Sequence, residues 1–113
     1  MSALMIHATI RITLPSKKVK EALEILGSEA ERTRVQPGCL SSRVYHDIQD
    51  RNVIMVEEMW RSEEELERHL RSDEYHKVLL VMEMALKQPE IRFDTISSST
   101  GIENIEKARS HAK

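Results

Sequence analysis

Apolar and polar residues alternate strictly near the start of the chain. Every second residue from 6 to 14 is apolar, and the residues between them are His, Thr, Arg and Thr. A period of two predicts a β-strand over 5–14 with one apolar and one polar face. Pro15 ends the strand, and after Ser16, a good N-cap, apolar residues recur every three or four positions. This spacing predicts an amphipathic helix over 17–35, followed by a turn at Gln36-Pro37-Gly38.

The rest of the chain predicts two strands joined by a hairpin, a broken helix and a final strand. Ser62 stands three residues before Glu65 in a capping box that opens the helix, and a second cap at Ser72 interrupts it. Pro89 ends the helix at about residue 87. We expect its buried side chains to be Tyr75, Val78, Leu79, Met82 and Leu86. The later elements are strands over 39–47 and 53–60, the broken helix over 62–87, a strand over 91–96 and a weakly apolar helix in the last dozen residues.

The order β-α-β-β-α-β is typical of the ferredoxin-like α+β fold, a four-stranded antiparallel sheet with the helices on one face. We expect one such domain over residues 1–97, with a polar linker and a tail helix over 98–113. The sheet face away from the helices is predicted to be too apolar in places for plain solvent, which favours a homodimer. The residues on that face include His7, Arg11, Arg43, Tyr45, Glu57 and Met59.

Composition narrows the classes of protein that remain. The 113 residues suffice for one domain, and a net charge of −2 with both signs dispersed gives no patch for nucleic acid or an anionic membrane. The longest apolar run, residues 78–82, is far shorter than the roughly 20 residues of a membrane helix. The opening MSALMIHATI lacks the features of a secretory signal, and the single Cys39 excludes an internal disulfide. We expect a cytoplasmic protein. Its three glycines are isolated and form no Gly-rich phosphate-binding loop, so we expect no nucleotide or flavin cofactor.

Several motifs resemble the antibiotic biosynthesis monooxygenase family. The segment Glu58-Met59-Trp60-Arg61-Ser62 resembles that family's Glu-x-Trp at the end of the third strand, followed by a residue that opens the next helix. His69 follows the Trp by nine residues, and the Ser72–His76 segment and the turn Gln36-Pro37-Gly38-Cys39 also match. The resemblance covers about residues 4–97, and it implies a dimeric ferredoxin-like α+β barrel.

The resemblance implies a range of chemistries. Characterised members include cofactor-free oxygenases of quinols and polyketide phenols, heme-degrading enzymes, and an isomerase of a signalling sugar derivative. The heme-degrading branch carries an Asn on the first strand, which this chain lacks. The polyketide-oxidising branch carries an Asn four residues before the strand-end Trp, where this chain has Val56. What remains is the general group of quinol oxidases and the isomerase, neither with a cofactor.

His69 and Glu58 are the predicted catalytic residues. A phenolate donates an electron to dioxygen far more readily than a phenol, and an imidazole, which titrates near neutral pH, suits removal of the phenol's proton. The structural alternative for His69 is a half-buried side chain bonded to Glu65 or Asp73. Glu58 shares a strand face with Trp60, and it either orients a histidine or arginine or forms a structural pair.

Trp60, Tyr75 and His76 are the predicted substrate-binding residues. Trp60 is expected to form an aromatic wall for a flat ring, or else to be a core residue. His69, Asp73 and His76 would align as metal ligands on a continuous helix, but the cap at Ser72 interrupts that helix, so no metal site is expected.

The sequence therefore favours a cofactor-independent monooxygenase that oxidises a small quinol or phenol with dioxygen. Its expected partners are a small aromatic molecule, dioxygen and a second copy of the chain. Two alternatives stay open. One is an isomerase of a small signalling or sugar-derived metabolite that uses the same residues to move protons. The other is a non-catalytic dimer that binds a small molecule.

Overall fold

The computed structural model describes residues 4–111, so the outer ends of the predicted 1–97 and 98–113 segments, and the first three residues of MSALMIHATI, lie outside the described part. Four strands form one sheet in the order β2-β3-β1-β4, and every neighbouring pair is antiparallel. The strands are β1 (Met5–Thr13), β2 (Cys39–His46), β3 (Val53–Trp60) and β4 (Glu90–Ile96). The predicted strands are thus confirmed to within one residue at each end.

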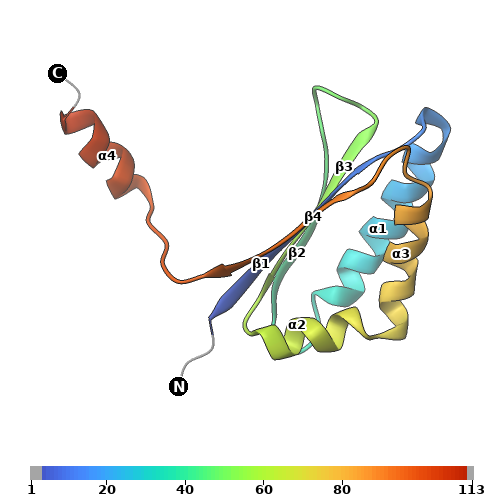
Figure 1. The fold of residues 1–113 in the computed structure, drawn as a ribbon, viewed down its shortest axis with the longest axis horizontal. Helices are drawn as coiled ribbons and strands as arrows, with labels where there is room; N and C mark the ends of the chain where they lie inside the picture. Colours follow the sequence, from blue (N-terminus) through green and yellow to red (C-terminus); the bar gives the residue numbers. More distant parts are fainter. Residues whose placement is uncertain (1–3, 112–113) are drawn as a thin grey trace.

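The helices α1, α2 and α3 lie together on one side of the sheet (Figure 1). This arrangement confirms the predicted ferredoxin-like α+β fold. Two of the three predicted N-caps are present: the Ser62 hydroxyl accepts from the Glu65 N–H, and the Ser72 hydroxyl accepts from the Tyr75 N–H. The predicted cap at Ser16 is wrong, because Ser16 lies inside a 3-10 turn that begins after Pro15, and the residue before α1 is Lys18, with no side-chain cap. The helices are α1 (Val19–Thr33), α2 (Glu63–Leu70) and α3 (His76–Glu83), with short 3-10 turns at Ser16–Lys18 and Asp73–Tyr75.

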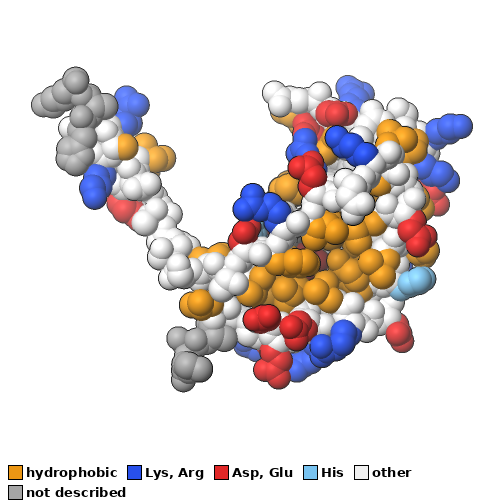
Figure 2. Space-filling model, in the orientation of Figure 1, with side chains coloured by type: hydrophobic (Ala, Val, Ile, Leu, Met, Phe, Trp, Pro, Cys, Tyr) orange, Lys and Arg blue, Asp and Glu red, His pale blue; other side chains and the backbone are white. Residues whose placement is uncertain are grey.

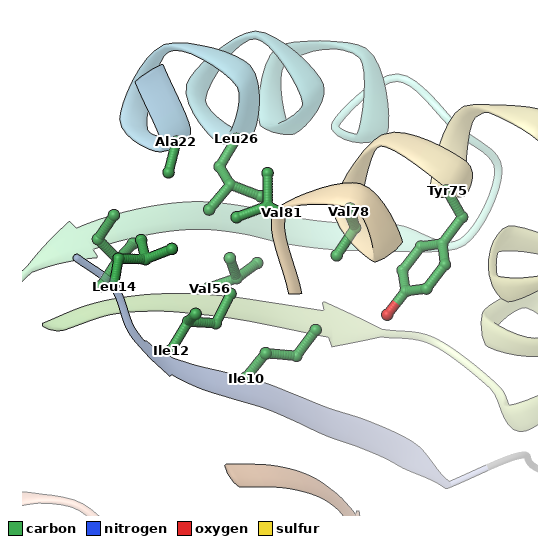
Figure 3. Packing of buried hydrophobic residues seen from close by; sticks show 10 residues of the cluster. Ile10, Ile12, Leu14, Ala22, Leu26, Val56, Tyr75, Val78 and Val81 are labelled. Carbon is green, nitrogen blue, oxygen red and sulfur yellow. The ribbon is translucent and has the colours of Figure 1, made fainter. Parts of the chain in front are cut away.

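Strand register places the apolar side chains of β1 and β3 on the face under the helices. Ile10 pairs with Val56 and Ile12 with Ile54, and all four are buried. The core between sheet and helices is shown in Figure 3, where Tyr75 points from the start of α3 toward the sheet. The labelled members of this core are Ile10, Ile12, Leu14, Ala22, Leu26, Val56, Tyr75, Val78 and Val81.

Two predicted core residues of the second helical segment are exposed. Leu79 is 43% exposed and Leu86 is 64% exposed, so their predicted burial is wrong. The physical reason is that α3 ends at Glu83 and not at about residue 87 as predicted, and that β4, at the sheet edge, is left largely uncovered on this side. Phe93 of β4 is 48% exposed, although it pairs with the buried Ala8. Figure 2 shows the result, a hollowed apolar surface on the face of the molecule turned toward the viewer.

The tail forms the predicted helix, α4 (Ile102–His111), which projects away from the sheet (Figure 1). Ile102 and Ile105 are both largely exposed. The radius of gyration is 16.4 Å, whereas a compact domain of this length has roughly 13 Å. Among residues 4–111, no helix is both long enough and apolar enough to cross a bilayer.

Candidate active site

The C-terminal end of β3 brings a carboxylate and an indole together under the helices. Glu58 and Trp60 are two residues apart, so both side chains lie on the helix-facing side of the strand. Trp60 is completely buried, and its Nε1 donates a hydrogen bond of 2.9 Å to Oε1 of Glu58. A bond from a neutral donor to a carboxylate is stronger than one between neutral groups. The indole therefore holds the carboxylate in one orientation.

His69, near the end of α2, packs onto this pair from the helix side of the sheet. Its ring stacks on that of Trp60 with centroids 4.8 Å apart and planes 28° from parallel. Tyr75 meets the same imidazole edge-on, with centroids 5.1 Å apart. The second cap determines this arrangement, because the Ser72 hydroxyl donates to the carbonyl of His69 and accepts from the N–H of Tyr75.

The two ring nitrogens of His69 face different groups. Nδ1 is 3.0 Å from Oε1 of Gln36, a residue of the turn between α1 and β2. Nε2 is 3.5 Å from Oε1 of Glu58, a separation longer than that of an ordinary hydrogen bond. Within the described residues, Nε2 is buried and has no hydrogen-bond partner. A glutamate and a histidine thus face each other with no bond between them.

The carboxylate changes the acidity of its neighbours. Burial, together with the charge of Glu58, raises the pKa of Tyr75 to about 12. The same two causes, burial first and Glu58 second, raise the pKa of the Cys39 thiol. Both groups are therefore protonated at neutral pH, and neither is a ready nucleophile or base. Glu58 and His69 are the other titratable side chains of this cluster.

The two differ in how far solvent reaches them. The His69 side chain is fully enclosed, whereas 10% of the Glu58 side chain is accessible. Of the two side chains, only the carboxylate has surface that a molecule from outside can contact.

A cavity of about 320 Å³ opens beside this cluster, between α2 and the β1–β4 pair. Two of its lining residues, Ile6 and Leu66, also pack against Trp60, so the cavity and the cluster share a wall. The cavity lies on the part of the molecule where β4 is uncovered, and Phe93 forms one side of it. Its lining residues are Ile6, Glu63, Leu66, Glu67, Leu70, Phe93 and Thr95.

The structure brings four of the five predicted site residues together and leaves one outside. Glu58, Trp60, His69 and Tyr75 form the buried cluster. His76, the first residue of α3, is exposed and contributes nothing to it. The 3-10 turn at Asp73–Tyr75 breaks the helix on which His69 and His76 would align, and within residues 4–111 no three side chains of metal-ligating type are grouped.

Gln36 was missed by the sequence analysis. It belongs to a turn, and nothing in the sequence of a turn indicates a contact 33 positions away. The structural alternative for His69, a bond to Glu65 or Asp73, is also replaced by Gln36. The Glu65 carboxylate instead accepts from Arg61 and Ser62.

A model of the antibiotic biosynthesis monooxygenase family matches residues 5–79, about two thirds of the chain. The chain belongs to this family. Family membership agrees with the resemblance noted in the sequence, and residues 5–79 include all five predicted site residues. Among curated protein sequences no relative is found.

Solved structures of the same fold come from several organisms. A conserved protein from Methanosarcina mazei is 27% identical, with a TM-score of 0.76 over 81% of this chain and 92% of its own. A Deinococcus radiodurans protein named as a candidate member of the same monooxygenase family is 15% identical, with a TM-score of 0.78 over 86% and 97%. A Bacteroides thetaiotaomicron protein of unknown function, described as a possible oxidoreductase, is 18% identical, with a TM-score of 0.72 over 84% and 98%. At these identities the two bacterial structures establish the fold alone.

Proposed function

We propose that the chain is a cofactor-independent monooxygenase that oxidises a small quinol or phenol with dioxygen in the cavity beside the buried cluster of Glu58, Trp60, His69 and Tyr75. The observation that carries the proposal is the buried pair of Glu58 and His69, 3.5 Å apart, in a cluster whose Trp60 packs against two residues of the cavity wall, Ile6 and Leu66. A buried site with two proton-accepting groups suits the first step, because a phenol that has lost its proton donates an electron to dioxygen far more readily.

The reaction needs no further reductant. A phenol with a free ring position and dioxygen give a quinone and water: one oxygen atom enters the ring and the other leaves as water. All four electrons that dioxygen takes up come from the substrate. The chain's own contribution is to bind the ring, exclude water and accept the phenolic proton.

Burial favours a particular order for the proton acceptors. The sequence suggested His69 as the base with Glu58 behind it. The imidazole is enclosed, whereas the carboxylate is partly accessible. We therefore propose that Glu58 takes the substrate proton and that His69 is the second acceptor, which receives the proton from Glu58. A positioned base of this kind contributes roughly 10²- to 10⁴-fold in rate.

The proposal gives the role of stacking on the substrate ring to Phe93 in place of Trp60. Trp60 has no exposed surface in the described structure, so its role is to hold Glu58 and to support the His69 ring. Phe93 lines the cavity and remains half exposed, so its ring is available to stack on a flat substrate. Tyr75 packs against the imidazole with the two ring planes 82° apart. His76 remains only a candidate for the outer rim of the site.

An isomerase is the second candidate, because an adjacent carboxylate and imidazole can move a proton between two carbon atoms without dioxygen. Oxygen consumption separates the two functions. A non-catalytic binding protein would consume no oxygen and convert no substrate.

The decisive experiment is dioxygen uptake with a panel of hydroquinones and phenols, after subtraction of each compound's spontaneous oxidation. We expect enzyme-dependent uptake that falls at least 100-fold in Glu58→Gln and in His69→Gln. Glu64→Gln, an exposed glutamate of α2, is the matched control and is expected to keep full uptake. Uptake that survives both site substitutions would remove this site from the reaction, and no uptake with any compound would refute the oxygenase.

We also propose that the working form is a homodimer, made through the sheet face that lies opposite the helices. That face combines partly buried methionines, Met55 and Met59, with a contact of 2.8 Å between Nε2 of His7 and Oε2 of Glu57. The α4 arm projects from the same molecule with two exposed isoleucines. Because an isolated helix of ten residues is marginal in water, contact with the second copy would stabilise it.

A further inference from the structure

We propose that Gln36 is a positioning residue that determines which nitrogen of His69 carries the hydrogen. This inference rests on the proposed function, in which Glu58 and His69 pass a proton. Its basis is the contact of 3.0 Å between Oε1 of Gln36 and Nδ1 of an imidazole that is only 1% exposed. A carbonyl oxygen only accepts hydrogen bonds, so the nitrogen that faces it carries the hydrogen.

The backbone holds Gln36 from both sides. Its N–H donates to the carbonyl of Thr33 at the end of α1, and its own carbonyl accepts from the N–H of Cys39 at the start of β2. Gly38 then takes a φ of +85°, and its carbonyl accepts from the N–H of Arg61 at the end of β3. The turn is therefore tied to the strand that carries Glu58, and Gln36 has a defined place relative to the pair.

With the hydrogen on Nδ1, the neutral ring presents a lone pair at Nε2 toward Glu58. Two acceptors with no proton between them do not form a hydrogen bond. This matches the separation of 3.5 Å and the lack of a partner for Nε2 among the described residues. Such a pair is ready to receive a proton, because one that Glu58 takes from the substrate can pass to Nε2.

The other tautomer would block this relay. With the hydrogen on Nε2, the ring would donate to Glu58 and that nitrogen would have no lone pair left for a proton. Gln36 thus has the role that a carbonyl or carboxylate often has behind a catalytic or metal-bound histidine. It touches neither the cavity nor a reacting atom, so loss of its carbonyl should lower kcat and leave KM unchanged.

The test reads the tautomer directly by long-range ¹H–¹⁵N NMR of the imidazole rings, with the signal of His69 assigned by its absence in His69→Gln. We expect wild type and Gln36→Glu, which keeps an acceptor oxygen, to show hydrogen on Nδ1. Gln36→Leu is expected to show it on Nε2. Hydrogen on Nε2 in wild type, or no change in Gln36→Leu, would overturn the inference.

The kinetic arm separates this inference from the function on which it rests. With an active quinol, Gln36→Leu should lose about 10- to 100-fold in kcat at unchanged KM, and Gln36→Glu should restore most of it. If no quinol is oxidised, the proposed function fails, and the NMR result still decides the role of Gln36. If Gln36→Leu does not fold, the wild-type spectrum alone decides it. An equal loss of activity in both Gln36 variants would contradict the positioning role.

Discussion

Tyr75 offers a quantitative test of the environment beside Glu58. Burial and the nearby carboxylate raise its pKa to about 12, whereas an unfolded chain titrates a tyrosine near pKa 10. The folded state therefore holds the phenolic proton more tightly than the unfolded state. Its stabilising contribution is complete below about pH 10 and is lost as the pH rises from about 10 to 12. At pH 11 the loss amounts to about 1 to 2 kcal/mol, and it approaches about 3 kcal/mol above pH 12.

Urea unfolding at pH 9, 10 and 11 measures this loss, with the fluorescence of the single, fully buried Trp60 as the signal. Wild type should lose about 1 to 2 kcal/mol more than Tyr75→Phe between pH 9 and pH 11, because only wild type has a phenol to ionise at this position. Other groups that titrate in this range are common to both proteins and cancel. Tyr45→Phe, at the other tyrosine, is the control and should keep the wild-type slope. Equal losses in wild type and Tyr75→Phe would refute the reasoning.

Three further predictions follow from separate features of the structure. Gly38→Ala should destabilise the fold by about 1–3 kcal/mol in urea, because φ is +85° and a Cβ would meet the Glu65 carboxylate. Its partner variant Gly27→Ala should raise stability by about 0.5–1 kcal/mol, since that helical site is open; the reverse ranking would contradict the turn geometry. Cys39 should react slowly with iodoacetamide at pH 8 and faster in Glu58→Gln, because the carboxylate contributes to its raised pKa; an unchanged rate would show that the two groups do not interact. A dimer of chains ended at residue 97 should dissociate at a higher protein concentration than the full-length dimer, as measured by light scattering. The double variant Ile102→Asp with Ile105→Asp should match the shortened chain, whereas the control Asn104→Asp should match the full chain. Unchanged dissociation would exclude α4 from the dimer.

The fold was predictable because local patterns and tertiary structure agree. Strict alternation over 5–14 identified β1, and the caps at Ser62 and Ser72 marked where two helical segments begin. Alternation also placed Glu58 and Trp60 on one face, and the register of β1 with β3 confirms it. Each of these signals involves residues that are near neighbours in sequence.

The features that were not predicted depend on packing between distant segments. Leu79 follows the helical pattern of a core residue, yet it is exposed because β4 is left uncovered on the helix side. Gln36 reaches His69 across 33 positions, through a turn whose sequence indicates only a change of direction. The accessibility that separates Glu58 from His69 depends on how α2 lies over the sheet, which no periodicity reveals.

In the proposed reaction, one atom of dioxygen enters a phenolic ring. Turnover under ¹⁸O₂ tests it most directly, with the quinol that gives the fastest uptake and with the product trapped at once by reduction. We expect one ¹⁸O atom in each product molecule and the other in water, and we expect neither labelled product with Glu58→Gln. Unlabelled quinone with hydrogen peroxide, or a product of unchanged mass, would contradict it.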